Sequence, residues 1–129
     1  MVIDTSAIIA IIADEPAADD LTVRIARAAV REMSVVSYVE AATVLLTRTI
    51  SPDRLDTLLI QLGISVVDVD VAQGREAVRS RIAYGKGTGH PAQLNFGDTF
   101  TYALTKLRGA PLLFVGDDFG HTDLVSALA

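Results

Sequence analysis

The chain has 129 residues, half of them hydrophobic, with a formal net charge of −5 and no cysteine. This length predicts one domain over residues 1–129, and the lack of cysteine excludes disulfides, thiolate metal sites and a cysteine nucleophile. The acidic balance argues against a protein that grips nucleic acid through a broad basic face. Because the longest apolar run is too short to cross a bilayer and no Lys or Arg precedes it, we expect a cytoplasmic protein without a membrane segment or signal peptide.

The chain begins with a short apolar run that ends on a carboxylate. Val2 and Ile3 suit a strand buried on both faces, and Asp4 follows directly. We expect Thr5 or Ser6 to stop the strand and cap a helix. In open α/β sheets the binding crevice lies at this carboxyl edge of the strands, so Asp4 is the first candidate functional residue.

The next part of the chain predicts two helices separated by a strand. Pro16 suits the first turn of a helix that extends over residues 17–31, with apolar residues on one side and arginines on the other. Residues 33–36 form a short strand candidate. Ser37 is expected to begin a helix that continues to about Thr49.

The middle of the chain repeats this alternation. Leucines at helical spacing predict a helix around Leu55–Leu62, which could serve either the core or an interface. The β-branched stretch 64–69 predicts a strand. A helix is expected over residues 71–84, with Val78 and Ile82 facing inward.

The last part begins with an irregular, glycine-rich stretch over residues 85–97. From Asp98 the spacing predicts a helix, and residues 112–115 predict a buried strand closed by Asp117 and Asp118. Such an alternation of strands and helices favours an α/β fold with a mainly parallel sheet and helices on both faces.

Each of the later acidic residues has a structural explanation when it is taken alone. Ser37-x-x-Glu40 matches a capping box, in which the glutamate accepts a hydrogen bond from the backbone of the capping residue. Asp98 at a helix start suits a cap or the helix dipole. Asp117 and Asp118 follow a strand, where aspartate is common in turns.

Taken together, the acidic residues indicate a metal site. Asp4, Glu40 and Asp117 or Asp118 each follow a strand, so they fall on one edge of the sheet, and Phe96 and Phe100 are expected to anchor the Asp98 helix in the core. Carboxylates gathered in one crevice repel one another unless a cation neutralises them. Without cysteine, such a site suits Mg²⁺ or Mn²⁺, and these ions typically act on phosphates.

The motifs of other phosphate-binding proteins do not match the spacing of residues in this sequence. The run from Gly85 to Thr88 lacks the order of a phosphate-binding loop and follows a helix. Asp4-Thr5-Ser6 lacks the acidic pair of response-regulator receivers and the Asp-x-Asp of haloacid-dehalogenase-like phosphatases. A different class, a non-catalytic partner-binding module whose acidic residues only cap helices, remains the alternative.

Four motifs in order along residues 2–124 resemble the PIN-domain family and, more narrowly, the VapC toxins of VapBC toxin–antitoxin pairs. The last two are the specific ones. The motifs are Val2–Ala7, Ser37-x-x-Glu40, Leu94–Phe100 with Tyr102–Leu104, and Leu112–Phe119 with Thr122-Asp123.

This resemblance implies a three-layer α/β/α domain with Mg²⁺- or Mn²⁺-dependent endoribonuclease activity. It also implies a homodimer, an RNA substrate and a cognate VapB-type antitoxin whose C-terminal tail covers the active-site groove. The family's acidic quartet falls on Asp4, Glu40, Asp98 and Asp118. Asp117 ranks below Asp118 as a metal ligand, because its position varies between acidic and amide residues in the family, and Asp123 is an auxiliary metal candidate.

The hypothesis that follows is hydrolysis of an RNA phosphodiester by metal-activated water, with one or two ions held by the quartet. Such a reaction leaves 5′-phosphate and 3′-hydroxyl ends. Thr5 or Ser6 could orient a ligand or water. Lys86, Arg79 and Arg81 are candidates for contacts to the RNA backbone.

Overall fold

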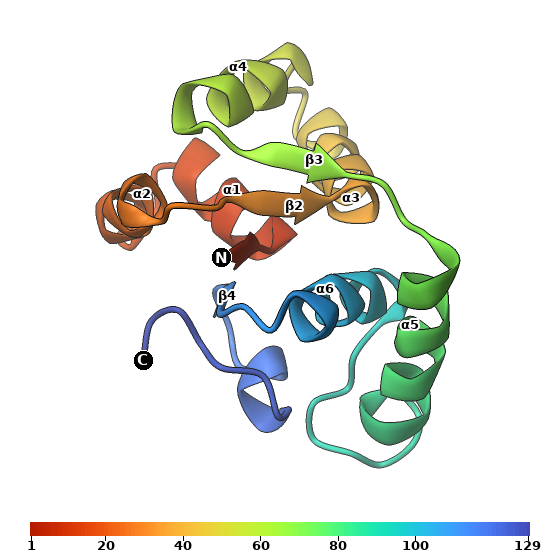
Figure 1. Cartoon of the computed structure of the whole chain (residues 1–129). Coiled ribbons are helices and arrows are strands. Elements are labelled where there is room, and N and C mark those ends of the chain that lie inside the picture. The colour runs from red at the N-terminus through yellow and green to blue at the C-terminus, as the bar shows by residue number, and fades with distance from the viewer.

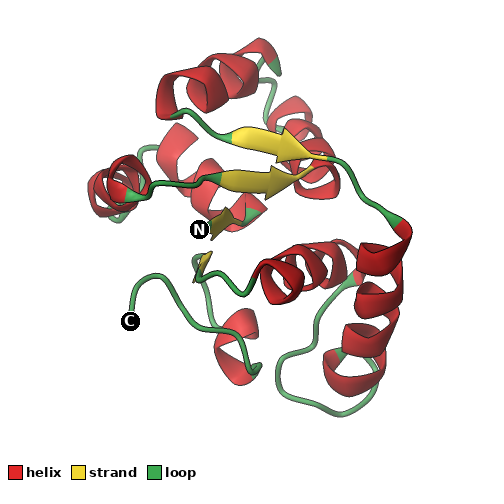
Figure 2. Cartoon of the chain, viewed as in Figure 1, coloured by secondary structure: helices red, strands yellow, loops and turns green.

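The computed structural model describes all 129 residues. Short parallel strands lie among helices (Figure 2). The strands alternate with helices along the chain, as the sequence predicts. The elements are β1 (Val2–Ile3), α1 (Thr5–Ile12), α2 (Ala18–Arg27), β2 (Glu32–Ser34), α3 (Val35–Thr47), α4 (Asp53–Leu62), β3 (Ser65–Val67), α5 (Val71–Tyr84), α6 (Phe96–Arg108), β4 (Leu112–Leu113) and the 3₁₀ turn η1 (Asp118–His121).

The four strands form one sheet in the order β3-β2-β1-β4, and every pairing is parallel. Figure 1 shows β3 and β4 at opposite edges, with β1 and β2 between them. From β1 the chain proceeds to β2 on one side, whereas β4 joins β1 from the other. The sheet therefore has a switch point between β1 and β4, and a crevice is expected outside their carboxyl ends.

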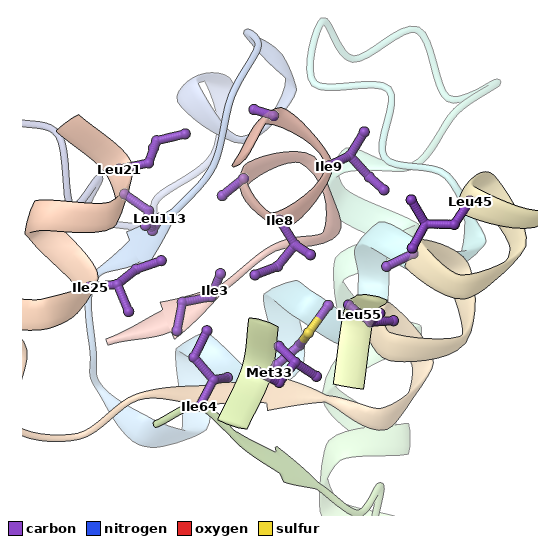
Figure 3. Packing of buried hydrophobic residues seen from close by; sticks show 14 residues of the cluster. Ile3, Ile8, Ile9, Leu21, Ile25, Met33, Leu45, Leu55, Ile64 and Leu113 are labelled. Carbon is purple, nitrogen blue, oxygen red and sulfur yellow. The ribbon is translucent and has the colours of Figure 1, made fainter. Parts of the chain in front are cut away.

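Each face of the sheet carries its own hydrophobic core, because successive strand residues point to opposite faces. Ile3 and Leu113 belong to the cluster that packs under α1, α2 and α4 (Figure 3). Their neighbours Val2 and Leu112 belong to a second cluster, built mainly with α6 and the end of the chain. This arrangement confirms the predicted three-layer α/β/α fold.

Several predicted helix boundaries were wrong, and three of them concern the site, among them the start of α6, which is Phe96 and not Asp98. Asp4 itself caps α1 by accepting a hydrogen bond from the Ser6 backbone, so neither Thr5 nor Ser6 is the cap. Ser34 caps α3, so β2 ends at Ser34 and Ser37 lies inside the first turn of the helix. The helix predicted over 17–31 is α2 and ends at Arg27.

The leucine-rich helix α4 belongs to the core. Leu55 and Leu59 are buried, while Ile60 on the opposite side is 80% exposed. Gly63 ends the helix in the left-handed conformation, with φ of 63°, that favours glycine.

The inward face of α5 differs from the prediction. Val78 and Ile82 are 60% and 73% exposed, whereas Gln73 and Ser80 are buried. Helices α5 and α6 lie side by side (Figure 1), so small and polar side chains are accommodated between them. Phe96, expected to anchor α6 in the core, is 78% exposed. No helix of the structure is long and apolar enough to span a membrane.

Candidate active site

Asp4 is fixed by hydrogen bonds at the carboxyl end of β1. Asp4 is only 5% exposed. One carboxylate oxygen, Oδ2, accepts hydrogen bonds from the Ser6 backbone N–H at 3.0 Å and the Ser6 hydroxyl at 2.7 Å. The other, Oδ1, accepts from the Thr101 hydroxyl at 3.0 Å. Three donors hold this carboxylate in one orientation.

Two of these donors connect Asp4 to other elements. Because Thr101 donates to Asp4, its oxygen accepts from the buried Ser37 hydroxyl, 2.8 Å away, and this links α6 to α3. The Ser6 oxygen accepts from the backbone N–H of Val115, just after β4, at 3.0 Å. Ser37 and Thr101 were missed as site residues, because only the tertiary structure brings their hydroxyls to Asp4.

Glu40 caps no helix. Since Ser34 is the N-cap of α3, Glu40 lies in the second turn, and the predicted Ser37–Glu40 capping box does not form. The Glu40 pKa is raised to about 7, first by burial and then by the charges of Asp4 and Asp98. Glu40 is therefore a partly buried carboxyl that faces two others and has no structural task in its own helix.

Asp98 caps a helix and also lies near other carboxylates. With Asn95, the N-cap of α6, it completes a capping box: Asp98 Oδ2 accepts the Asn95 N–H at 3.0 Å, and Asn95 Oδ1 accepts the Asp98 N–H at 2.9 Å. Its pKa is nevertheless raised to about 6, mainly by burial, opposed by the Asn95 hydrogen bond and reinforced by Asp4 and Asp118. The structural explanation for Asp98 is thus correct but incomplete.

Three of the four predicted quartet members meet in one cleft of about 360 Å³. Arg48 is the only basic residue in its lining. No three His, Asp or Glu side chains are close enough, as they stand, to coordinate one ion. The lining residues are Asp4, Thr5, Ser6, Ile9, Glu15, Glu40, Val44, Arg48, Asp98 and Val115.

The remaining predicted acidic residues lie outside this lining. Asp118 opens η1, is exposed, and is near enough to Asp98 for its charge to raise the Asp98 pKa. Asp117 directly precedes η1 and is also exposed.

Asp123 is engaged elsewhere. Its carboxylate accepts hydrogen bonds from the Tyr102 hydroxyl at 2.7 Å and from Lys106 Nζ at 2.5 Å. These partners, Lys106 first, hold the Asp123 pKa below its ordinary value. Asp123 lines a separate cleft together with Lys106.

The basic residues predicted to contact RNA also lie in different surroundings. Arg79 forms an ion pair with Glu76 on its own helix. Arg81 and Lys86 line a second cleft, of about 480 Å³, with the aromatic residues Phe96 and Phe100. Asn95 belongs to this lining, so the second cleft reaches the N-terminus of α6 close to Asp98.

The donor set of the acidic cleft fits a hard divalent cation. Its ligands are carboxylate oxygens, the type that Mg²⁺ and Mn²⁺ prefer, and no thiolate or imidazole is among them. Burial first, and then the neighbouring carboxylates, raise the pKa of Glu40 and Asp98, so their charged forms are unfavourable without a nearby cation. A bound cation would stabilise these charged forms.

Comparison with known proteins identifies the family of the chain. The PIN domain family model matches residues 1–124. The chain is 45% identical over 130 residues to VapC ribonuclease Mb2780c of Mycobacterium bovis, covering 96% of both chains. It is also 45% identical over 128 residues to the ribonuclease VapC of Mycolicibacterium smegmatis, covering 98% of both.

Two solved structures share the fold at lower identity. VapC20 of Mycobacterium tuberculosis, described as a sarcin–ricin loop cleaving toxin, aligns with a TM-score of 0.73 and 18% identity over 96% of this chain and 95% of that one. A chain of a toxin–antitoxin complex from Klebsiella pneumoniae aligns with a TM-score of 0.71 and 16% identity over 92% and 88%. The chain therefore belongs to the PIN-domain family and, within it, to the VapC ribonucleases.

Proposed function

We propose that this protein is a Mg²⁺- or Mn²⁺-dependent endoribonuclease and the toxin of a toxin–antitoxin pair. The observation that carries the proposal is the cleft where Asp4, Glu40 and Asp98 converge, with the pKa of Glu40 and Asp98 raised by burial and by neighbouring carboxylates. Relatives that are 45% identical over nearly the whole chain are named ribonucleases, which supports the same activity here.

In this proposal each acidic residue has a separate task. Asp4, held rigid by Ser6 and Thr101, and Asp98, held by the capping box, are preorganised ligands. Glu40, which has no hydrogen-bonded task in its helix, and the exposed Asp118 complete the ligand set by side-chain rotation. A bound cation would activate water and neutralise charge on an RNA phosphodiester, leaving 5′-phosphate ends.

Asp117 stays a weaker candidate, because it lies one residue before η1 and no contact to the cleft supports it. Asp123 has a structural task in the proposal, since Tyr102 and Lys106 occupy its carboxylate. Arg81 and Lys86, in the neighbouring cleft, remain candidates for contacts to the RNA backbone only if the dimer face proposed below lies elsewhere, because both proposals use the same cleft.

The activity is tested with a mixed RNA pool and purified protein freed of any antitoxin, incubated with Mg²⁺, Mn²⁺ or EDTA. We expect metal-dependent cutting that leaves 5′-phosphates and that disappears in Asp98→Asn. Cutting that is equal in the variant would reveal a contaminating nuclease, and no cutting with any metal would refute the proposal.

We also propose a cognate antitoxin of the VapB type as partner and the cytoplasm as location. The fold shared with a chain of a toxin–antitoxin complex and the named VapC relatives support the partner. Co-expression with a candidate antitoxin of the VapB type, followed by purification, should yield a complex that does not cut RNA.

Homodimerisation is proposed through one exposed apolar face, formed by Val78 and Ile82 of α5 and Phe96 of α6. These side chains are 60–78% exposed and line the same cleft. A contiguous exposed apolar surface is typical of an interface. Light scattering should show a dimer that Ile82→Asp converts to monomer, while Ile60→Asp, at an equally exposed site on α4, leaves it intact.

A non-catalytic binding module is the second candidate, because two of the three acidic residues do cap helices. Asp4 caps α1 and Asp98 completes the capping box of α6. Glu40 distinguishes the ribonuclease proposal from the binding module, since it caps no helix. Stoichiometric Mn²⁺ binding that Glu40→Gln weakens would exclude the binding module.

A further inference from the structure

Gly97, the second residue of α6, has no backbone reason to be glycine. It is not among the glycines with positive φ, so its conformation is open to any residue. Within a helix, glycine is less favourable than alanine by about 0.5–1 kcal/mol. Another cause must therefore account for a glycine in the first turn of the helix that carries Asp98.

The cause is visible in what surrounds Gly97. A Cβ atom added there would lie under 3.0 Å from Cδ, Oε1 and Oε2 of Glu40, closer than real Cβ atoms come to other atoms. These three atoms are the Glu40 carboxyl group itself. The carboxyl thus occupies the volume that any other residue at position 97 would fill.

The contact belongs to a regular arrangement between α3 and α6. Ser37 and Glu40 are three residues apart, and Gly97 and Thr101 are four apart, so each pair shares one helix face. Ser37 and Thr101 are hydrogen-bonded at 2.8 Å, one turn away from Glu40 and Gly97. The hydrogen bond fixes the spacing of the helices, and Gly97 leaves room for the carboxyl at the next level.

We infer that Gly97 is a positioning residue: by lacking a side chain, it allows the Glu40 carboxyl to lie beside Asp98 and reach the acidic cleft. The role of this placement in cation binding depends on the proposed function. Because the carboxyl is the free end of a flexible side chain, a methyl group at position 97 displaces it without unfolding the protein. The expected defect is therefore in cation affinity, with folding preserved.

Mn²⁺ titration by calorimetry tests the inference in the full chain. We expect Gly97→Ala to lower Mn²⁺ affinity by about 10-fold or more, the range seen when groups that orient a ligand are lost. Gly74→Ala is the matched control, because Gly74 lies within α5 and a Cβ there meets nothing within 4 Å. The control should bind Mn²⁺ as the wild type does, and wild-type affinity in Gly97→Ala would overturn the inference.

A second experiment needs no metal. Melting temperatures are measured in EDTA for Gly97→Ala, Glu40→Ala and the double variant. If the methyl group and the carboxyl compete for space, Gly97→Ala raises the melting temperature more in the Glu40→Ala background than in the wild type. An equal change in both backgrounds would overturn the inference, whatever the nuclease does. Failure of the wild type to bind Mn²⁺ would instead refute the proposed function.

Discussion

Carboxyl groups at two places in this protein, the cleft at the end of β1 and the surface near Asp123, behave in opposite ways. In the cleft at the end of β1, Glu40 and Asp98 face Asp4, and both have a raised pKa because they are partly buried among like charges. At the other end of α6, Asp123 accepts hydrogen bonds from Lys106 and Tyr102, and its pKa is lowered. Asp123 already has its partners, whereas Arg48 is the one basic residue in the lining of the cleft. This difference supports the proposal that the cleft binds a cation.

The largest difference is expected when one carboxylate is removed from the cleft and one from the Asp123 site. Asp98→Asn should reduce RNA cleavage by at least about 100-fold, because loss of groups that merely orient a metal ligand already costs 10–100-fold. The asparagine retains an acceptor for the Asn95 N–H, so the helix cap survives. Asp123→Asn should retain cleavage close to the wild-type rate. Equal losses in a cleavage assay would contradict the assignment.

The pH dependence of stability should differ between the groups. Glu40 and Asp98 have folded pKa values of about 7 and 6, above their ordinary values of 4.5 and 3.8. Between these limits the folded protein holds protons that the unfolded chain has lost, so their contribution to stability decreases as pH rises. In EDTA we expect this pair to lower the melting temperature from pH 5 to pH 8.

The control for this prediction is the double variant Glu40→Gln with Asp98→Asn, in which the pH slope should flatten. Asp123 has the opposite sign, because its lowered pKa stabilises the fold above its ordinary value of 3.8 and loses that effect as pH falls. A slope unchanged in the double variant would show that other groups cause it.

Thr101 tests whether Asp4 needs its hydrogen-bonded support. Thr101→Val removes a buried donor to the Asp4 carboxylate and should cost about 1–3 kcal/mol of unfolding free energy. Thr101→Ser keeps the hydroxyl and should recover most of it. Chemical denaturation measures both, and a valine variant as stable as the serine variant would refute the role of the hydroxyl.

Much of this arrangement could be predicted from the sequence, since apolar periodicity marks the strands and helices and the order of motifs selects the acidic residues. The residues that cap the helices were harder to predict from the sequence. Ser34 and Ser37 both precede an apolar run, and only the end of β2 decides that Ser34 is the cap. Because Ser34 is the cap, Glu40 does not form the capping box that was its structural explanation.

Contacts between distant elements were not predictable. Val78 and Ile82 have the spacing of a buried face, but α5 packs closely on α6 through Ala77 and Ser80, so the larger side chains remain outside. The Ser37–Thr101 hydrogen bond joins residues 64 positions apart. The closeness of Gly97 to Glu40 likewise depends on how α3 and α6 pack, for which neither local sequence carries a signal.

The smallest effect is expected at Lys106. Its ammonium group pairs with Asp123 at the surface, where ion pairs contribute little because water and salt screen them. Lys106→Met should lower the melting temperature only slightly, less so at high salt, and should leave Mn²⁺ binding unchanged. A loss of Mn²⁺ binding in this variant would show that Asp123 and the cleft carboxylates belong to one site.

The central claim is that the carboxylates of the β1 cleft gather to hold a cation, and Glu40 tests it most directly because Glu40 caps no helix. The measurement is Mn²⁺ titration by calorimetry at neutral pH for the wild type, Glu40→Gln and Asp123→Asn. We expect stoichiometric binding by the wild type and by Asp123→Asn, and at least about 10-fold weaker binding by Glu40→Gln. Absence of binding by the wild type, or equal affinity in all three proteins, would contradict it.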